Sequence, residues 1–350
     1  METKLFSITT GSNLSTTLLD AADIIKSGGL VVFPTETVYG LGADATNPTA
    51  TSKIYLAKGR PSDNPLIIHI AKPEDAEIYT YTNSIYYLLA EHFMPGPLTV
   101  ILPSRESIPL TTRGGLQTVA VRCPENRIAR ALIELCDVAI AAPSANLSGS
   151  PSPTTFEYAY ADMNGRVDAI IDGGNCDFGL ESTIVKINDD NSLTLLRPGK
   201  ITKEDLEMIG LEVVVANAVT QTLSEGETAI SPGMKYKHYA PVAPLVLLDG
   251  TKEQAAAFIS ENMSVDKKVA VIAYEDDVTY LSEALPYADL YKFGARGNEE
   301  EQARLLFKLL RDTDKNDYSV IYAPLPDTSG IGLALYNRMI RAAAHNIIRL

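Results

Sequence analysis

Residues 30–45, LVVFPTETVYGLGADA, decide the fold class of this 350-residue chain. Leu30 to Phe33 form an apolar run that stops at Pro34, the pattern of a short buried strand. Polar and aromatic side chains follow before two glycines; they are Thr35, Glu36, Thr37 and Tyr39. Open α/β sheets bind ligands at the carboxyl ends of their strands, which favours a substrate site here. A plain turn is an equal alternative, because proline and glycine are common turn formers.

The alternation of apolar runs with helical patterns continues to about residue 212. Further predicted strands are Pro65–Ile70, Leu98–Leu102, Val119–Arg122, Val138–Ala142, Ala169–Asp172 and Ser182–Ile187. Helical periodicity lies between several of them, as in Ile85–Phe93 and Arg127–Leu135. We therefore predict a mixed α/β domain over residues 1–212.

A change of composition precedes a second domain. Residues 213–244 include the segment SPGMKYKHYAP, which is too aromatic and too basic for a plain spacer. Strand and helix patterns then alternate again as far as a last helix near 332–346, which predicts a small βαβ unit. The predicted division is a domain at 1–212, a linker at 213–244 and a second domain at 245–350.

Bulk composition limits what the protein can do. The formal net charge of −14 disfavours a broad nucleic-acid surface, because an acidic protein repels the phosphate backbone. No apolar run reaches the ~18 residues of a membrane span, and the N-terminus lacks a signal-peptide pattern, so we expect a cytoplasmic protein without membrane contact. Three widely spaced cysteines predict small buried hydrophobes; a catalytic thiol at Cys123 has only the adjacent Arg122 in its favour.

Standard catalytic motifs are missing. The sequence contains no G-x-x-x-x-G-K-[ST], G-x-G-x-x-G, H-E-x-x-H or G-x-S-x-G motif, which argues against common phosphate loops, metalloproteases and serine hydrolases. Four scattered histidines and no Cys-x-x-Cys pair predict no protein-held metal. Any chemistry must therefore come from dispersed polar residues.

Basic and amide side chains in the irregular stretch 58–69 suit an anion. Lys58 offers a point charge and Arg60 a planar fork, and Asn64 can hydrogen-bond a neighbouring group. A solvated surface pair is the alternative for Lys58 and Arg60. A satisfied core residue is the commoner role for a histidine such as His69 on an apolar strand.

Later strand ends repeat this pattern. Arg122 ends an apolar strand, where a charge requires an anionic partner. Small polar side chains after strand 138–142 lie in a Pro/Gly-bounded loop and let donors approach an anion closely. The polar residues of this loop and of two later blocks are Ser144, Asn146, Ser148, Ser182, Thr183 and Arg197.

Seven sequence blocks occur in order, and together they carry a family resemblance. They are FPTETVYGLGADA (33–45), KGRPSDNPLIIH (58–69), MPGPLTVIL (94–102), TVAVRCP (118–124), APSANLSG (142–149), ESTIV (181–185) and LRPG (196–199). These blocks resemble the YrdC-like threonylcarbamoyl-AMP synthases, and SPGMKYKHYAP with the trailing unit resembles their two-domain form. The resemblance implies an α/β protein with a YrdC-like twisted mixed-sheet domain followed by a small Rossmann-like βαβ domain.

The resemblance also implies an activity. Such enzymes are nucleotidyltransferases that condense L-threonine, bicarbonate and ATP into L-threonylcarbamoyladenylate and release pyrophosphate. Threonylcarbamoyl transferase machinery then moves the group to adenosine 37 of tRNAs that read ANN codons, so no stable tRNA binding is expected of the synthase. Mg²⁺ is expected on the ATP phosphates rather than in a protein cage.

Roles for single residues follow from the same resemblance. Lys58 and Arg60 would be catalytic and hold the phosphates. Further nucleotide contacts would come from Asn64, Thr118, Ser144, Asn146, Thr154 and Arg197. The threonine would be bound by Thr37, His69, Arg122, Ser182 and Thr183. Tyr236 and His238 would touch the nucleotide from a linker that closes as a lid, with an anchor between the domains as the alternative.

Two other functions fit parts of the sequence. A double-stranded-RNA-binding module is the first, and the net charge of −14 weighs against it. A carbamoyl-transferring maturation factor is the second, but such proteins carry zinc-finger segments, for which this chain has no cysteine pairs. The sequence assigns no role to residues 245–350.

Overall fold

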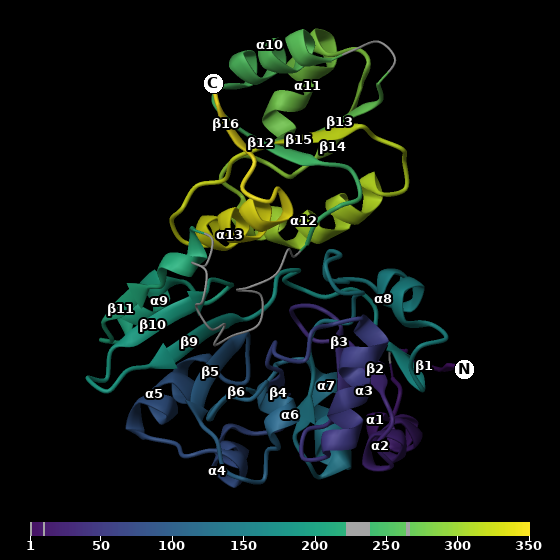
Figure 1. Ribbon diagram of the computed structural model, residues 1–350, viewed down its shortest axis with the longest axis vertical. Coiled ribbons are helices and arrows are strands. Elements are labelled where there is room, and N and C mark those ends of the chain that lie inside the picture. The colour runs from purple at the N-terminus through teal and green to yellow at the C-terminus, as the bar shows by residue number, and fades with distance from the viewer. Residues whose placement is uncertain (1, 10, 222–238, 264–266) are drawn as a thin grey trace. The chain divides into compact units, whose positions relative to one another are not determined.

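A computed structural model describes residues 2–9, 11–221, 239–263 and 267–350. The chain divides into two compact units: Met1–Ser148 with Ser152–Lys235, and Gly149–Pro151 with Tyr236–Leu350. The domain boundaries predicted at residues 212 and 244 stay a prediction. Each unit is built on its own sheet, as Figure 1 shows.

A mixed eleven-stranded sheet forms the frame of the first unit, in the order β1-β8-β2-β3-β7-β4-β6-β5-β9-β10-β11. Its strands are β1 (Lys4–Ser7), β2 (Val31–Phe33), β3 (Gly40–Asp44), β4 (Ile67–His69), β5 (Leu98–Pro103), β6 (Thr118–Arg122), β7 (Ile140–Ala141), β8 (Ala169–Asp172), β9 (Thr183–Ile187), β10 (Leu193–Arg197) and β11 (Val213–Val215). Parallel pairs such as β4 with β6 alternate with antiparallel pairs such as β5 with β6. The predicted mixed sheet is confirmed.

Helices pack on this sheet and supply its core. They are α1 (Leu14–Thr17), α2 (Leu19–Lys26), α3 (Pro48–Lys58), η1 (Pro73–Asp75), α4 (Ala76–Tyr79), α5 (Ser84–Phe93), α6 (Leu110–Arg113), α7 (Arg127–Cys136), α8 (Phe156–Met163), α9 (Lys203–Met208) and η2 (Asn217–Val219). Apolar residues at helical spacing on α7, among them Ile128 and Leu132, pack with Ile25 of α2 against Phe33 of β2. This packing fixes the strand end from which the loop 34–39 departs.

Strand β3 was not predicted, because its sequence GLGAD is rich in glycine, which weakens strands. Packing explains the glycine at position 42. A Cβ atom there would lie 2.7 Å from Phe33 and 2.8 Å from Ile140, closer than side-chain atoms can approach. The two neighbouring strands therefore require the absence of a side chain at Gly42.

The second unit is a parallel five-stranded sheet in the order β14-β13-β15-β12-β16. Its strands are β12 (Leu245–Asp249), β13 (Val269–Ala273), β14 (Ala288–Lys292), β15 (Val320–Pro324) and β16 (Ile347–Arg349). Its helices are α10 (Lys252–Asn262), α11 (Glu275–Ala284), α12 (Glu299–Thr313) and α13 (Gly332–Ala342). Within this unit, α10 and α11 cover one face of the sheet and α12 and α13 the other (Figure 1). The predicted Rossmann-like unit is confirmed.

All three cysteines are free and buried, which confirms their prediction as buried hydrophobes. Burial raises the pKa of the Cys123 thiol to about 12. This thiol is therefore protonated near neutral pH, which removes the alternative of a catalytic thiolate. In the part of the chain that the structure describes, no helix combines the length and hydrophobicity of a membrane span.

Candidate active site

One edge of the first unit's sheet collects polar side chains from five strands. Strands β4 and β6 are parallel and end together, with His69 opposite Arg122. Strand β5 is antiparallel to β6 and therefore begins at this edge, with Thr99 opposite Arg122. Strand β9, parallel to β5, begins here just after Ser182, and antiparallel β10 ends here at Arg197. We call His69, Thr99, Arg122, Ser182 and Arg197 the strand-end cluster.

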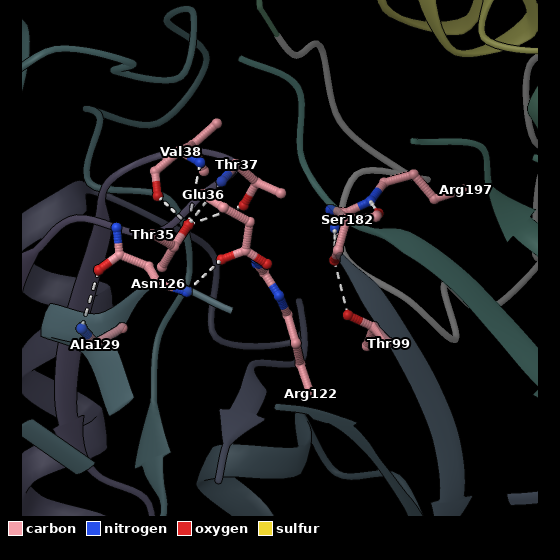
Figure 2. Close-up of polar contacts among 10 residues, drawn as sticks. All are labelled: Thr35, Glu36, Thr37, Val38, Thr99, Arg122, Asn126, Ala129, Ser182 and Arg197. Atoms are coloured by element: carbon pink, nitrogen blue, oxygen red, sulfur yellow. Dashed lines mark hydrogen bonds and ion pairs between the residues drawn. The ribbon is translucent and has the colours of Figure 1, made fainter. Parts of the chain in front are cut away.

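Hydrogen bonds hold Ser182 at the centre of one half of this cluster. Its hydroxyl lies 2.7 Å from the Thr99 hydroxyl. Arg197 donates from Nη2 to the Ser182 hydroxyl at 3.0 Å and from Nε to the Ser182 carbonyl at 2.9 Å (Figure 2). Arg197 was predicted to contact the nucleotide. The structure places it beside Ser182, which was predicted to bind the substrate L-threonine. The neighbouring Thr183 donates its hydroxyl to the Ile201 carbonyl at 2.7 Å.

The loop after β2 is tied into a compact turn by Thr35. The Thr35 hydroxyl accepts from the backbone N–H groups of Thr37 and Val38, at 3.2 Å each, and donates to the Val38 carbonyl at 2.6 Å. It also lies 2.9 Å from the Thr37 hydroxyl. Threonine hydroxyls often close turns in this way, which explains the local sequence. The turn is fully buried and presents Glu36 to the sheet (Figure 2).

A buried ion pair joins this loop to the strand-end cluster. Glu36 Oε1 lies 2.6 Å from Arg122 Nη2, and the two side chains are only 7% and 5% exposed. Glu36 Oε2 accepts from the Asn126 N–H at 3.4 Å, at the start of α7. The sequence argument required an anionic partner for Arg122, and the structure supplies it within the chain. Glu36 was assigned no role from the sequence. A carboxylate that follows an apolar strand also requires a partner of opposite charge, so Glu36 could have been paired with a cation on the same grounds.

Buried polar atoms without a hydrogen-bond partner gather at predicted site residues. Among the described residues, such atoms are Asn64 Oδ1, His69 Nδ1, Arg113 Nε and Arg122 Nε. Folded proteins rarely leave buried polar atoms unsatisfied, so each one calls for an explanation. Three of these four belong to residues that the sequence assigned to substrates. A ligand that reaches them would supply the missing partners.

His69 is neutral at this site. Burial, aided by the positive charge of Arg122, lowers the pKa of the His69 imidazole to about 3. The ring therefore offers one donor and one acceptor nitrogen near neutral pH rather than a charge. An uncharged ring at this position is suited to hydrogen bonding rather than to proton transfer near neutral pH.

A second group of predicted residues lies toward the opposite ends of β4 and β6. Lys58 is buried at the end of α3, and its Nζ donates to the Ser144 carbonyl at 2.5 Å and the Asn146 carbonyl at 2.6 Å. The Ser144 hydroxyl donates to Asn146 Oδ1 at 2.5 Å. Lys58 thus braces the loop after β7, a contact that the phosphate prediction did not include. We call Lys58, Arg60, Asn64, Ser144 and Asn146 the loop cluster.

Arg60 and Asn64 are linked through the backbone. Arg60 Nη2 donates to the Pro65 carbonyl at 3.1 Å, and Arg60 Nε lies 3.4 Å from the Asn64 carbonyl. Pro65 lies two residues before β4 and four residues before His69, so only about 13 Å of extended chain separates it from the His69 end. A substrate the size of a nucleotide spans that length and can touch both clusters.

The remaining predicted residues are more scattered. Thr118 begins β6, four residues from Arg122 and so about 13 Å from it along the strand. Thr154 is buried, and its carbonyl accepts from the Cys176 N–H at 2.8 Å. Tyr236 and His238 lie outside the described residues, and the lid prediction with them.

An open hollow of about 480 Å³ borders the buried ion pair. Its lining residues are Glu36, Pro97, Glu125, Asn126, Arg127, Asp177, Phe178 and Lys200. Sequence reasoning missed Lys200, which follows the LRPG block directly. Within the part of the chain that is described, no group of three or more His, Cys, Asp or Glu side chains is arranged to hold a metal ion.

Comparison with known families covers almost the whole chain. The family described as telomere recombination, which takes in the Sua5, YciO and YrdC proteins, matches residues 23–199. The family described as threonylcarbamoyl-AMP synthase, C-terminal domain, matches residues 201–344. The match of both families in this order corresponds to a two-domain protein.

Individual relatives match over the same extent. The threonylcarbamoyl-AMP synthase of Bacillus subtilis is 42% identical, with complete coverage of both chains. That of Pyrococcus abyssi is 42% identical over 94% of this chain and 95% of its own length. A crystal structure of P. abyssi Sua5 complexed with L-threonine is 39% identical, covers 100% of both chains and superposes with a TM-score of 0.89.

Proposed function

Because the chain belongs to the threonylcarbamoyl-AMP synthase family in its two-domain form, we propose that this enzyme condenses L-threonine, bicarbonate and ATP into L-threonylcarbamoyladenylate. One observation carries the proposal beyond the family match. Buried polar atoms of Asn64, His69 and Arg122 have no partner within the described residues, and all three lie on predicted substrate residues. A site with these unmet donors and acceptors fits a polar substrate that enters the buried end of the sheet.

The proposed reaction has two bond-forming steps. The threonine amine attacks bicarbonate to form a carbamate, with loss of water. A carbamate oxygen then attacks the α-phosphorus of ATP, and the bond to the bridging oxygen breaks to release pyrophosphate. The threonine carbamate and ATP are both anionic, so cations must offset their repulsion, and positioning with charge stabilisation supplies most of the catalysis.

The strand-end cluster is the proposed threonine site. His69 and Ser182 would hydrogen-bond the amino acid, with Thr37 and Thr183 beside them. Arg122 would bind the carboxylate through the donors that Glu36 leaves available, since Glu36 engages Nη2 and Nε makes no hydrogen bond. In this arrangement the buried Glu36 keeps the guanidinium in place before substrate arrives.

The loop cluster is the proposed nucleotide site. Arg60 would hold the phosphates directly, with Asn64 beside it. Lys58 would act with Arg60 on the phosphates while bracing the Ser144–Asn146 loop through its carbonyl contacts. The further proposed nucleotide contacts are Thr118, Ser144, Asn146, Thr154, Arg197, Tyr236 and His238. Arg197, which bonds Ser182, would join the two substrates.

Mg²⁺ is proposed to arrive with ATP. A hard cation of this kind keeps several waters and binds phosphate oxygens well, so a protein cage is not required. Glu36, which lies against the strand-end cluster, is committed to Arg122. The donor set of the described site therefore fits a metal held by ATP.

The biological setting is proposed from the family. Residues 1–212 would form the catalytic domain, residues 213–244 a lid and residues 245–350 the second domain. The adenylate would pass to threonylcarbamoyl transferase machinery for adenosine 37 of ANN-reading tRNAs, without stable tRNA binding by this chain. The cytoplasmic location stays a prediction.

Pyrophosphate release by the full chain tests the proposal. With ATP, Mg²⁺, bicarbonate and L-threonine together we expect turnover, and we expect none when threonine or bicarbonate is left out. Lys58→Ala should abolish turnover. Lys53→Ala, on the same helix with its own ammonium-to-carbonyl bond to Gly28, should retain it. Threonine-independent pyrophosphate release, or equal activity in both variants, would contradict the proposed reaction or the proposed phosphate site.

A further inference from the structure

The parallel sheet of the second unit has a crevice at its carboxyl edge. Strands β12 and β13 lead into α10 and α11 on one face, whereas the strand between them, β15, leads into α13 on the other. Connections from neighbouring strands thus diverge in opposite directions, as Figure 1 shows for this unit. Open α/β sheets bind ligands where strand connections diverge in this way.

A cavity of about 100 Å³ occupies this crevice. Its floor is apolar and comes from both helices and the sheet: Ala255, Ile259, Val271, Leu281 and Tyr322. Several of these residues also belong to the apolar core of the second unit, so the crevice opens directly onto that core. We call the cavity the second-unit pocket.

Charges of both signs surround the mouth of the pocket. Asp277 is 11% exposed and lies 2.6 Å from Arg296 and 3.8 Å from Lys252. Arg296 is also held over the Tyr274 ring at 4.4 Å. Asp249, at the end of β12, is 51% exposed and lies 3.8 Å from Arg349, beyond hydrogen-bond distance. The charged lining therefore comprises two cations and two carboxylates.

We propose that the second-unit pocket binds a free zwitterionic α-amino acid with a small aliphatic side chain. The apolar floor suits the side chain, and the mouth offers groups for both charged ends. An apolar cavity of about 150 Å³ holds a benzene ring, so about 100 Å³ suits a branched chain of roughly three or four carbons.

The arrangement of charges gives the amino acid an orientation. Lys252 begins α10, whose N-terminus favours an anion, and it stands at the mouth beside Arg296. The ligand carboxylate therefore faces Lys252 and Arg296, and the ammonium faces Asp249. Asp277 positions the two cations and needs no direct contact with the ligand. This site belongs to the second unit alone and does not depend on the proposed reaction.

Calorimetric titration of the full chain with L-valine tests the proposal without any turnover. We expect saturable binding of one valine. Isovalerate, which lacks the ammonium, and isobutylamine, which lacks the carboxylate, should each bind about ten-fold more weakly or worse, because each loses a charge-assisted hydrogen bond. Equal binding of valine and isovalerate, or an absence of valine binding, would overturn the proposal.

A matched pair of substitutions and two further variants locate the binding. Ala255→Leu fills the pocket and should abolish valine binding, whereas Ala257→Leu makes the same change on the exposed side of α10 and should not. Asp249→Asn, at an exposed position that leaves the fold intact, should weaken binding about ten-fold. Ser182→Ala, in the first unit, should leave it unchanged. Valine binding that survives Ala255→Leu, or that is lost in Ser182→Ala, would contradict this assignment.

Discussion

Both units place charged groups at strand ends, but they treat those charges differently. In the first unit the Glu36–Arg122 pair is almost fully buried, and polar atoms nearby have no hydrogen-bond partner. In the second unit the Asp277–Arg296 pair has the same 2.6 Å separation, yet Arg296 is 60% exposed. The two ion pairs therefore contribute differently to the free energy of unfolding despite their equal distances, because the contribution depends on how far each pair is buried.

The difference also separates two ways of locating a site. The mixed sheet of the first unit follows no simple rule for ligand position, and its site emerges only from the register of β4, β5, β6, β9 and β10. The parallel sheet of the second unit obeys a general rule, so its pocket is found from topology. Burial and orphaned atoms mark the first site, whereas open space between helices and sheet marks the second.

Removing one partner of the buried pair is the largest expected effect. Arg122→Leu leaves Glu36 buried without its counter-charge, and we expect the free energy of unfolding to fall by about 3–5 kcal/mol. Urea unfolding measures this. The double variant Glu36→Leu/Arg122→Leu removes both charges and should recover much of the loss. If Arg122→Leu alone lowers the free energy of unfolding by less than about 1 kcal/mol, the Glu36–Arg122 pair behaves as a solvated pair. The proposed difference between the ion pairs of the two units would then be wrong.

The second largest expected effect is on catalysis and comes from removing the Ser182 hydroxyl. Ser182→Ala removes the shared partner of Thr99 and Arg197, and we expect kcat/KM for threonine to fall about ten- to hundred-fold. Steady-state kinetics should show KM for threonine rising more than KM for ATP. Ser52→Ala, at a partly exposed serine on α3, is the matched control and should behave as the parent. A larger rise for ATP would instead assign Ser182 to the nucleotide.

The neutral His69 predicts a pH effect on stability. Its pKa is about 3 in the folded chain and 6.5 ordinarily, so below pH 6.5 the unfolded state takes up a proton that the folded state refuses. Stability is therefore lost as pH falls from 6.5 toward 3, by at most about 1.4 kcal/mol per pH unit. His69→Gln should show a shallower slope over this range and the same slope above it. Parallel curves for parent and variant would show that His69 titrates normally.

The exposed pair of the second unit gives the smallest effect. Arg296→Leu should change the free energy of unfolding by only about 0–1 kcal/mol, because an exposed guanidinium gains little from its carboxylate. Urea unfolding under the conditions used for Arg122→Leu provides the comparison. A loss of several kcal/mol would place Asp277 in an environment as dry as that of Glu36.

The sequence predicted the positions of most strands in the first unit but few of the side-chain contacts between them. Apolar runs placed β5, β6 and β8 within a residue of their ends, because buried strands read as continuous hydrophobic stretches. The glycine-rich strand β3 was not predicted, because its position depends on packing against Phe33 and Ile140 rather than on a hydrophobic pattern of its own. The short edge strands β1, β14 and β16 also carry too little pattern to be predicted.

The site shows the same limit. The resemblance named His69, Arg122 and Ser182, and the register brings them together. It did not supply Glu36 or Thr99 as their partners, because such pairs depend on which strands are neighbours. Nor did it foresee that Lys58 donates to the carbonyls of Ser144 and Asn146. Pairwise contacts across a mixed sheet are decided by topology, which no local pattern encodes.

Isotope incorporation tests the central claim most directly. The full chain is incubated with ATP, Mg²⁺, L-threonine and ¹³C-bicarbonate, and the products are resolved by mass spectrometry. We expect L-threonylcarbamoyladenylate whose mass is raised by the single labelled carbon, formed in step with pyrophosphate. An unlabelled adenylate, threonyl-adenylate without the carbamoyl carbon, or no adenylate at all would contradict the account.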